Sequence, residues 1–236
     1  MKHRYLDAKK IRGFFLAGII AFTTMLTLSS CLKNRHNDDE APVSFITFIH
    51  SLPQYAAIDF AMSGVAVSSD PLLFTQNTGD MANSPYAGHY SGTYPFQVFT
   101  GPPVREVLRL TGTLEPNTTY SFFVATTSPA SDTVVAVVPK DNLTAPTGGK
   151  AKIRFVNLVR NTSSYDLAAQ NITTPLFTNK AYKANGDFIE VAPGDYVYDL
   201  KDAGTTTIRA TTTLKVEANK IYTIWASGGL SSATTT

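Results

Sequence analysis

Apolar and polar residues alternate at every second position in many short segments of this chain. Residues 94–99 and 196–201 are two examples, in which an aromatic or aliphatic side chain occupies each even-numbered position. This period of two predicts strands with one buried face. Beyond residue 30 no segment has a convincing helical period, so we predict an all-β fold.

The predicted strands recur in two copies. Residues 46–60 match residues 153–167 at a spacing of 107, and residues 86–120 match residues 188–222 at a spacing of 102. The first copy therefore contains five more residues, which fall in its turn-rich part. Each copy holds about seven short strands, and this number predicts two tandem immunoglobulin-like β-sandwich modules.

A segment rich in proline, glycine and small polar residues separates the two copies and is typical of a linker. The predicted organisation has five parts: a signal peptide (1–30), a lipidated cysteine with a flexible tether (31–42), a first β-sandwich (43–138), the linker (139–150) and a second β-sandwich (151–236).

The N-terminal segment has the pattern of a secretory signal, with basic residues up to Arg12 followed by an apolar run over residues 13–22. It ends in Leu28-Ser29-Ser30-Cys31, which resembles the lipobox of bacterial lipoproteins. In such proteins the cysteine thiol receives a diacylglyceryl group and the signal is cut before the cysteine. The alternatives are an uncleaved anchor helix and an ordinary signal whose cysteine is incidental.

A lipidated Cys31 would hold the protein on a membrane through acyl chains such as palmitate, without a membrane-spanning segment. We therefore expect an outer-membrane lipoprotein of the cell envelope, facing either the cell surface or the periplasm. Cys31 is the only cysteine, so the chain can form no internal disulfide, and its stability must come from core packing.

The formal charge of +2 depends on the signal peptide. Residues 1–30 contain five Lys/Arg and one acid, and without them 15 basic and 17 acidic residues remain. Such a nearly neutral chain has no long-range field to attract a polyanion, so nucleic acid is not expected as a partner.

Both copies carry a family resemblance, which spans most of residues 42–230 and is better in the second copy. The run 152–158 (Lys-Ile-Arg-Phe-Val-Asn-Leu), the turn at 191–196 and the strand entry at 217–223 resemble the bacterial lipoprotein and cell-wall family known as domain of unknown function 4397. In the first copy, Ser91-Gly92 replaces the usual Pro-Gly, and His50 stands where the second copy has Asn157. The resemblance implies an extracytoplasmic β-protein, and the family has no established catalytic residues to carry over.

The sequence contains none of the metal or nucleophile motifs that would indicate an enzyme, so no catalytic residue, metal or cofactor is predicted. His89 lies two residues from Ser91, but its partner in the second copy is a valine. We expect His50 to be a polar residue at a strand end, with its ring nitrogens bonded to the backbone. Trp225 is expected in the core or in a contact between the copies.

Candidate ligand contacts are Tyr86, His89 and Tyr90, because sugar rings stack on exposed aromatic side chains. The alternative for Tyr86 is that it packs inward like its counterpart Phe188. We predict a non-catalytic binding, adhesion or structural module for a glycan or an envelope protein. The alternative is an accessory protein or hydrolase that acts on envelope or extracellular polysaccharide.

The second copy is expected to lack a closing strand. At the spacing of 102, Thr236 matches Val134, where the β-branched closing run of the first copy begins. An uncovered edge is either blunted or pairs with another strand. Two solutions remain open: residues 227–236 fold over the gap or the copy tolerates a shorter sheet, or a partner strand binds at this edge.

Lipid anchoring is tested by growing cells with a palmitate analogue that can be labelled. The wild-type chain should take up the label, and Cys31→Ala should not, because the thiol is the only acceptor for the diacylglyceryl group. Equal labelling of the two proteins would contradict the lipobox interpretation.

Overall fold

The computed structural model describes residues 41–79, 84–161 and 163–228. Every named element within them is a β-strand, which confirms the all-β prediction. The predicted signal peptide, Cys31 and the predicted tether up to residue 40 lie outside the described residues. In the part that is described, no helix has the length and apolar character needed to cross a membrane.

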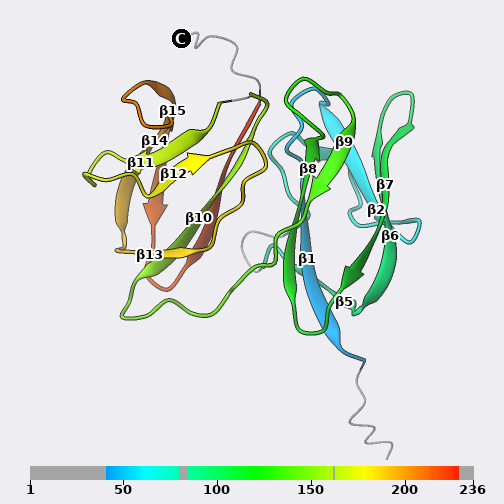
Figure 1. Cartoon of the computed structure of the whole chain (residues 1–236). Helices are drawn as coiled ribbons and strands as arrows, with labels where there is room; N and C mark the ends of the chain where they lie inside the picture. Colours follow the sequence, from blue (N-terminus) through cyan, green and yellow to red (C-terminus); the bar gives the residue numbers. More distant parts are fainter. Residues whose placement is uncertain (1–40, 80–83, 162, 229–236) are drawn as a thin grey trace, which may run out of the picture. The chain divides into compact units, whose positions relative to one another are not determined.

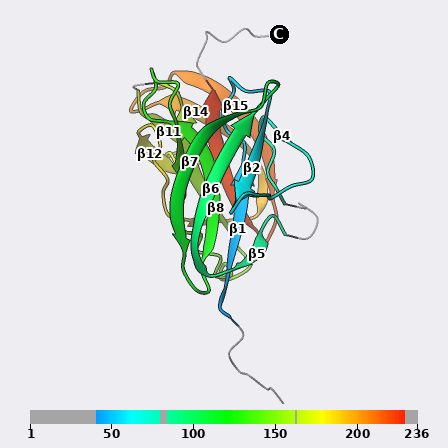
Figure 2. The same ribbon diagram turned by 90° about the vertical axis from the view of Figure 1, so that its right-hand side faces the viewer.

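The first sandwich is built from two sheets, ordered β5-β1-β8-β9 and β3-β2-β6-β7, with β4 pairing beside β2. Figure 2 shows the strands β2, β6 and β7 of the second of these sheets in front. The strands are β1 (Val43–Ile49), β2 (Ala57–Met62), β3 (Val65–Ala66), β4 (Leu72–Leu73), β5 (Ala87–Tyr90), β6 (Gly92–Thr100), β7 (Arg105–Leu114), β8 (Thr119–Thr126) and β9 (Val134–Val137).

The second sandwich repeats this arrangement with sheets ordered β13-β10-β16 and β12-β11-β14-β15. Its strands, of which all but β16 are labelled in Figure 1, are β10 (Ala151–Val159), β11 (Tyr165–Ala169), β12 (Phe177–Lys180), β13 (Ile189–Val191), β14 (Gly194–Asp202), β15 (Ile208–Val216) and β16 (Ile221–Gly228). Within the described residues, no strand follows β16 as β9 follows β8.

The two sandwiches share one strand register. β1 runs parallel to β8 with Ile46 opposite Tyr120, and β10 runs parallel to β16 with Ile153 opposite Tyr222. These pairs differ by the spacings of 107 and 102 that the sequence shows. Asn117 and Asn219 precede β8 and β16 with φ values of 54° and 62°, a left-handed conformation that asparagine tolerates in turns.

Each sandwich has its own apolar core. In the first, the aromatic rings of Phe48, Phe60, Phe96 and Phe122 lie together, with the centroids of Phe48 and Phe60 5.1 Å apart. In the second, the core is formed by the inward residues of all the long strands, and the rings of Tyr196 and Tyr198 stack with their centroids 5.4 Å apart. The alternation in sequence thus places one face of each strand inside.

A third apolar cluster joins the outer faces of two sheets. Ile49 and Phe123 come from the sheet of β1 and β8, and Val156 and Trp225 come from the sheet of β10 and β16. Phe123 and Trp225, which match at the spacing of 102, meet with ring centroids 6.1 Å apart. This confirms the expectation that Trp225 makes a contact between the two copies.

A buried ion pair lies beside this cluster. Arg154 on β10 and Asp141 in the linker segment are 1% and 0% exposed at their side chains, and Arg154 Nη1 lies 2.6 Å from Asp141 Oδ1. The linker begins as a continuation of the sheet rather than as a free loop, because the Asp141 N–H donates to the Thr119 carbonyl. The ion pair therefore fixes the second sandwich to the edge of the first.

Further polar groups surround both charges. Asp141 Oδ2 accepts hydrogen bonds from the Tyr86 hydroxyl at 2.8 Å and from Ser121 Oγ at 2.6 Å. Arg154 donates to Ser121 Oγ and, through Nε, to Thr223 Oγ1, both at 2.9 Å. Its guanidinium carbon also lies 4.7 Å from the centroid of the Phe188 ring, as in a cation–π contact.

Asp141→Ala should destabilise the protein by about 3 to 5 kcal/mol, because it leaves the Arg154 charge buried without a partner. The double change Asp141→Leu with Arg154→Met should lose much less, since neither charge remains. Urea unfolding followed by circular dichroism measures both. Lys140→Ala is the control: its pair with Glu115 is exposed, so the loss of stability should be small. Equal losses in the single and double variants would contradict a role for the buried charge.

Candidate functional site

His50 follows β1 and is fully buried. Its Nδ1 accepts a hydrogen bond from the Leu52 N–H at 3.3 Å, so Nε2 must carry the proton that is donated to the Tyr55 carbonyl at 2.9 Å. Asn157 repeats both contacts, because its Oδ1 accepts from the Val159 N–H and its Nδ2 donates to a backbone carbonyl. The structure confirms that His50 is a strand-end residue bonded to the backbone.

The buried position of His50 disfavours the charged imidazolium and lowers its pKa to about 4, although the hydrogen bond to the Tyr55 carbonyl acts in the opposite direction. His50 is therefore neutral at neutral pH, and both ring nitrogens are occupied by the backbone. It has no free nitrogen to act as a general base or to bind a metal.

The three candidate ligand contacts have different surroundings. The Tyr86 hydroxyl is bonded to Asp141, and this contact, together with burial, raises its pKa. His89 is half-buried on β5, and burial lowers its pKa. Tyr90 is 66% exposed. Because neighbouring residues of a strand face opposite sides, His89 and Tyr90 do not form one patch.

Tyr86 also lines a cavity of about 350 Å³ between the two sandwiches. The walls combine aromatic, aliphatic and polar side chains, and Thr47, whose buried hydroxyl has no hydrogen-bond partner among the described residues, lies at its side. The cavity thus joins Tyr86 to its counterpart Phe188, Phe123 and Trp225, a grouping that the sequence did not indicate.

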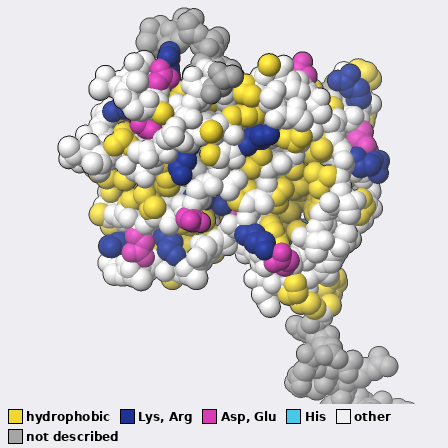
Figure 3. Space-filling model, in the orientation of Figure 1, with side chains coloured by type: hydrophobic (Ala, Val, Ile, Leu, Met, Phe, Trp, Pro, Cys, Tyr) yellow, Lys and Arg dark blue, Asp and Glu magenta, His cyan; other side chains and the backbone are white. Residues whose placement is uncertain are grey.

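The polar groups that resemble catalytic candidates have structural roles. Ser91 Oγ is 2.8 Å from Ser44 Oγ on the neighbouring strand. Asp166 accepts hydrogen bonds from two backbone N–H groups, those of Asn179 and Gly204. Across the described ranges, no three His, Cys, Asp or Glu side chains are grouped to hold a metal ion. On the face shown in Figure 3, positive and negative side chains lie near one another rather than in fields of one sign.

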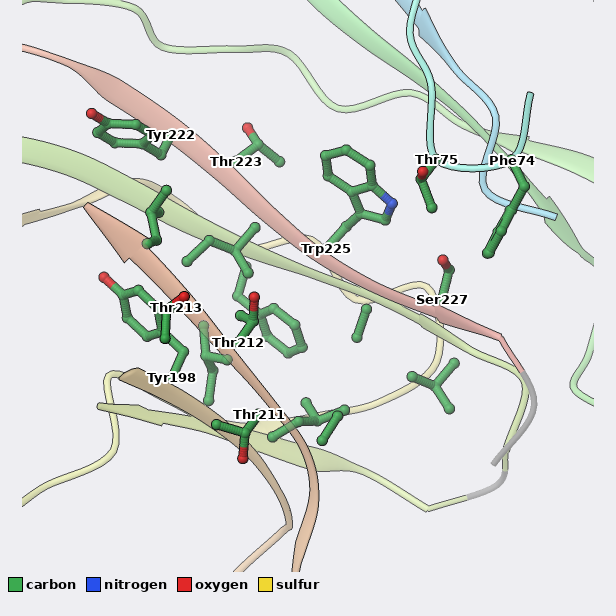
Figure 4. Close-up of a pocket in the computed structure, with 18 residues that line it drawn as sticks. Phe74, Thr75, Tyr198, Thr211, Thr212, Thr213, Tyr222, Thr223, Trp225 and Ser227 are labelled. Carbon is green, nitrogen blue, oxygen red and sulfur yellow. The ribbon is translucent and has the colours of Figure 1, made fainter. Parts of the chain in front are cut away.

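A second recess, a groove of about 550 Å³, lies between β15 and β16, at an edge where no described strand closes the second sandwich. Figure 4 shows Thr211, Thr212 and Thr213 on one side, and Tyr222, Thr223, Trp225 and Ser227 on the other. Phe74 and Thr75 of the first sandwich lie at one end. No charged side chain lines the groove, and its exposed surface is mostly apolar.

Small side chains on β15 deepen this groove. In the first sandwich Val98 lies opposite Leu108 and Phe96 opposite Leu110. At the same register in the second sandwich, Leu200 lies opposite Ala210 and Tyr198 opposite Thr212. Two leucines that pack on the first core are thus replaced by alanine and threonine. Comparing the two copies along β7 and β15 at the spacing of 102 could have revealed these positions from sequence.

One polar atom at the groove lacks a partner. The Tyr198 side chain is 1% exposed, and its hydroxyl makes no hydrogen bond with any described residue. Burial raises the pKa of this phenol to about 12. The corresponding residue of the first sandwich, Phe96, has no hydroxyl. A buried hydroxyl without a partner costs free energy, so a bound molecule that supplied one would be favoured here.

His50→Asn should make stability less dependent on pH. In the wild type, the unfolded His50 binds a proton near pH 6.5 and the folded one only near pH 4, so stability is lost as the pH falls between these values, by at most about 3 kcal/mol. Asparagine does not titrate, and Asn157 shows that it can serve at this position. Urea unfolding at pH 7 and pH 4.5 tests this: relative to the wild type, the variant should gain about 2 to 3 kcal/mol at the lower pH. An identical pH dependence of the two proteins would show that His50 titrates normally when folded.

Three solved structures have a weak similarity to the chain. The Bacillus anthracis TIE protein is 11% identical with a TM-score of 0.25, and the match covers 80% of this chain and 34% of that protein, so this chain spans about a third of its length. The family CBM26 module of Eubacterium rectale Amy13K, solved with maltoheptaose, is 10% identical with a TM-score of 0.24, covering 79% of this chain and 92% of the module. GBS52, the minor pilin of Streptococcus agalactiae, is 12% identical with a TM-score of 0.19, covering 82% and 98%.

At these TM-scores the three structures carry no weight for the fold or the function of this chain. No curated protein matches it in sequence. A family model does match, over residues 44–168, which is more than half of the chain. The matched range begins in β1 and ends in β11, so it includes the first sandwich, the segment with Asp141 and the strand that carries Arg154. The chain therefore belongs to the family described as domain of unknown function DUF4397.

Proposed function

We propose that this protein is a lipid-anchored, non-catalytic binding module of the cell envelope, with a role in adhesion or envelope structure. The observation that carries the proposal is the groove between β15 and β16, which is apolar, uncharged and open at the surface. A recess of about 550 Å³ lies within the range of ligand sites. Its lining provides surface for binding but contains no carboxyl group and no imidazole.

The lipobox supports anchoring at an outer membrane, with the module facing the cell surface or the periplasm. Residues 32–42 separate Cys31 from the start of β1. A chain of that length spans at most about 40 Å when fully extended. A module on such a tether would bind ligands close to the membrane in which its acyl chains lie.

The lining of the groove argues against the hydrolase alternative. A glycosidase needs two carboxyl groups on either side of the bond that is cleaved. None of the groove residues is Asp, Glu or His. The walls instead combine the rings of Tyr222 and Trp225 with the hydroxyls of β15, a combination that suits a neutral ligand such as a glycan or an uncharged protein segment.

Trp225 provides a direct readout, because it is the only tryptophan and it lines the groove. The full chain in detergent is titrated with envelope polysaccharide fragments and with separated envelope proteins. Binding should shift the tryptophan emission at saturation, and Trp225→Phe should abolish the signal. A reducing-end assay on the same mixtures should detect no cleavage. New reducing ends would favour the hydrolase, and an emission that no envelope fraction changes would contradict binding in the groove.

A further inference from the structure

The outer edge of β16 carries unpaired backbone groups. β16 pairs with β10 alone among the described strands. The Lys152 N–H bonds to the Lys220 carbonyl and the Arg160 N–H to the Gly228 carbonyl, so the even-numbered residues of β16 face β10. The N–H and C=O groups of Thr223, Trp225 and Ser227 consequently point outward along the groove.

The first sandwich shows what such an edge binds. There β9 pairs antiparallel with β8, with Val137 opposite Phe123 and Val135 opposite Ala125. The N–H groups along the matching edge of β8 are already bonded. Ser121 and Thr127 donate their N–H groups to the carbonyls of Pro139 and Thr133, which flank β9. Val134 of β9 lies in the core, with Ala136 packed against it. An extended, β-branched segment thus completes this sandwich.

We propose that the groove between β15 and β16 receives an extended strand of another protein, which pairs antiparallel with β16 as β9 pairs with β8. This inference deepens the proposed binding function by naming the ligand class. The strand would be uncharged and apolar or β-branched at alternate positions, because those side chains would enter the space beside Ala210, Thr212 and Ile224. A donor or acceptor carried by the strand could also satisfy the Tyr198 hydroxyl.

The composition of the edge supports a strand over a sugar. Edge strands that must stay unpaired carry charges, prolines or bulges. β16 has none of the charged residues or prolines, and it pairs with β10 in continuous register over its whole length. Oligosaccharides are held mainly by polar side chains, whereas this groove offers mainly apolar surface and backbone groups. A strand uses both.

Two residues that create the groove also provide a variant that fills it. Ala210→Leu with Thr212→Leu restores the leucines that the first sandwich has at these places. The double variant should fold, and its unfolding temperature should be higher than that of the wild type. The added side chains cover apolar core, and the first sandwich already accommodates leucines at the matching positions. Thr111→Leu is the matched control, because residue 111 matches residue 213 at the spacing of 102, is exposed on β7 of the first sandwich and does not line the groove.

The test uses a synthetic peptide of residues 132–140 as the probe strand and the full chain in detergent as the receptor. Binding is followed by Trp225 emission and by the anisotropy of a dye on the peptide. The peptide should bind the wild type and Thr111→Leu equally. Ala210→Leu with Thr212→Leu should bind it at least about tenfold more weakly, a loss of about 1.4 kcal/mol.

Methylation of peptide nitrogens tests the mode of binding. In the first sandwich the N–H groups of Val135 and Val137 face β8, by the same alternation that the Ser121 and Thr127 bonds show. A peptide methylated at those two nitrogens should lose binding, whereas one methylated at Val134 and Ala136 should keep it. Equal affinity of the two methylated peptides would overturn strand pairing.

The remaining outcomes distinguish between the possible occupants of the groove. Light scattering gives the oligomeric state: a wild-type dimer that the peptide or the two leucines dissociate would show that a second copy fills the groove, and would overturn the assignment to another protein. A monomer that does not bind the peptide would overturn the inference altogether. The proposed binding function would still stand in that case if envelope fractions changed the Trp225 emission of the same sample.

Discussion

The buried pair of Arg154 and Asp141 determines how the two halves of the described chain fit together. Both charges are removed from water, so each must be held by the other and by the hydroxyls around them. Tyr86 and Ser121 come from the first sandwich, and Thr223 from the second. Because these bonds form only when the sheets of β8 and β10 face each other in one arrangement, the ion pair makes that arrangement specific. The apolar contact of Phe123 with Trp225 buries further surface beside the ion pair.

Comparing the two copies shows which features the sandwiches share and where they differ. Matching residues have the same tasks, as His50 and Asn157 show by bonding to the backbone in the same pattern. The departures that form the groove fall at one place, the side of the second sandwich between β15 and β16. There a phenylalanine becomes Tyr198, two leucines become Ala210 and Thr212, and no described strand takes the place of β9. One copy is a closed sandwich, and the other keeps an opening.

This arrangement is consistent with the proposed binding function. The ion pair and the apolar contact beside it hold the second sandwich against the first. The lining of the groove contains no charged side chain and no histidine, so its interactions depend on shape, apolar contact and hydrogen bonds. Such interactions select a partner by the pattern of its side chains rather than by its charge.

Much of the architecture could be predicted from local sequence, because period-two alternation and a repeated spacing are properties of neighbouring residues. They determined the all-β fold, the matched register of Ile46 and Ile153, the backbone role of His50 and the closing strand at Val134. The ion pair was not predicted, since Asp141 stood in a segment read only as a linker and nothing in its sequence neighbourhood indicates Arg154.

Tertiary structure alone decided which side chains surround a given space. Tyr86 was a candidate for stacking on a ligand, but its hydroxyl is held by Asp141, more than fifty residues away along the chain. The groove was foreseen only as an unpaired edge. Its depth depends on Ala210 and Thr212 lying opposite Leu200 and Tyr198, and on a loop of the first sandwich at its end. Sequence patterns report which face of a strand is buried, whereas the contents of a site depend on which strands meet, and that is set by long-range packing.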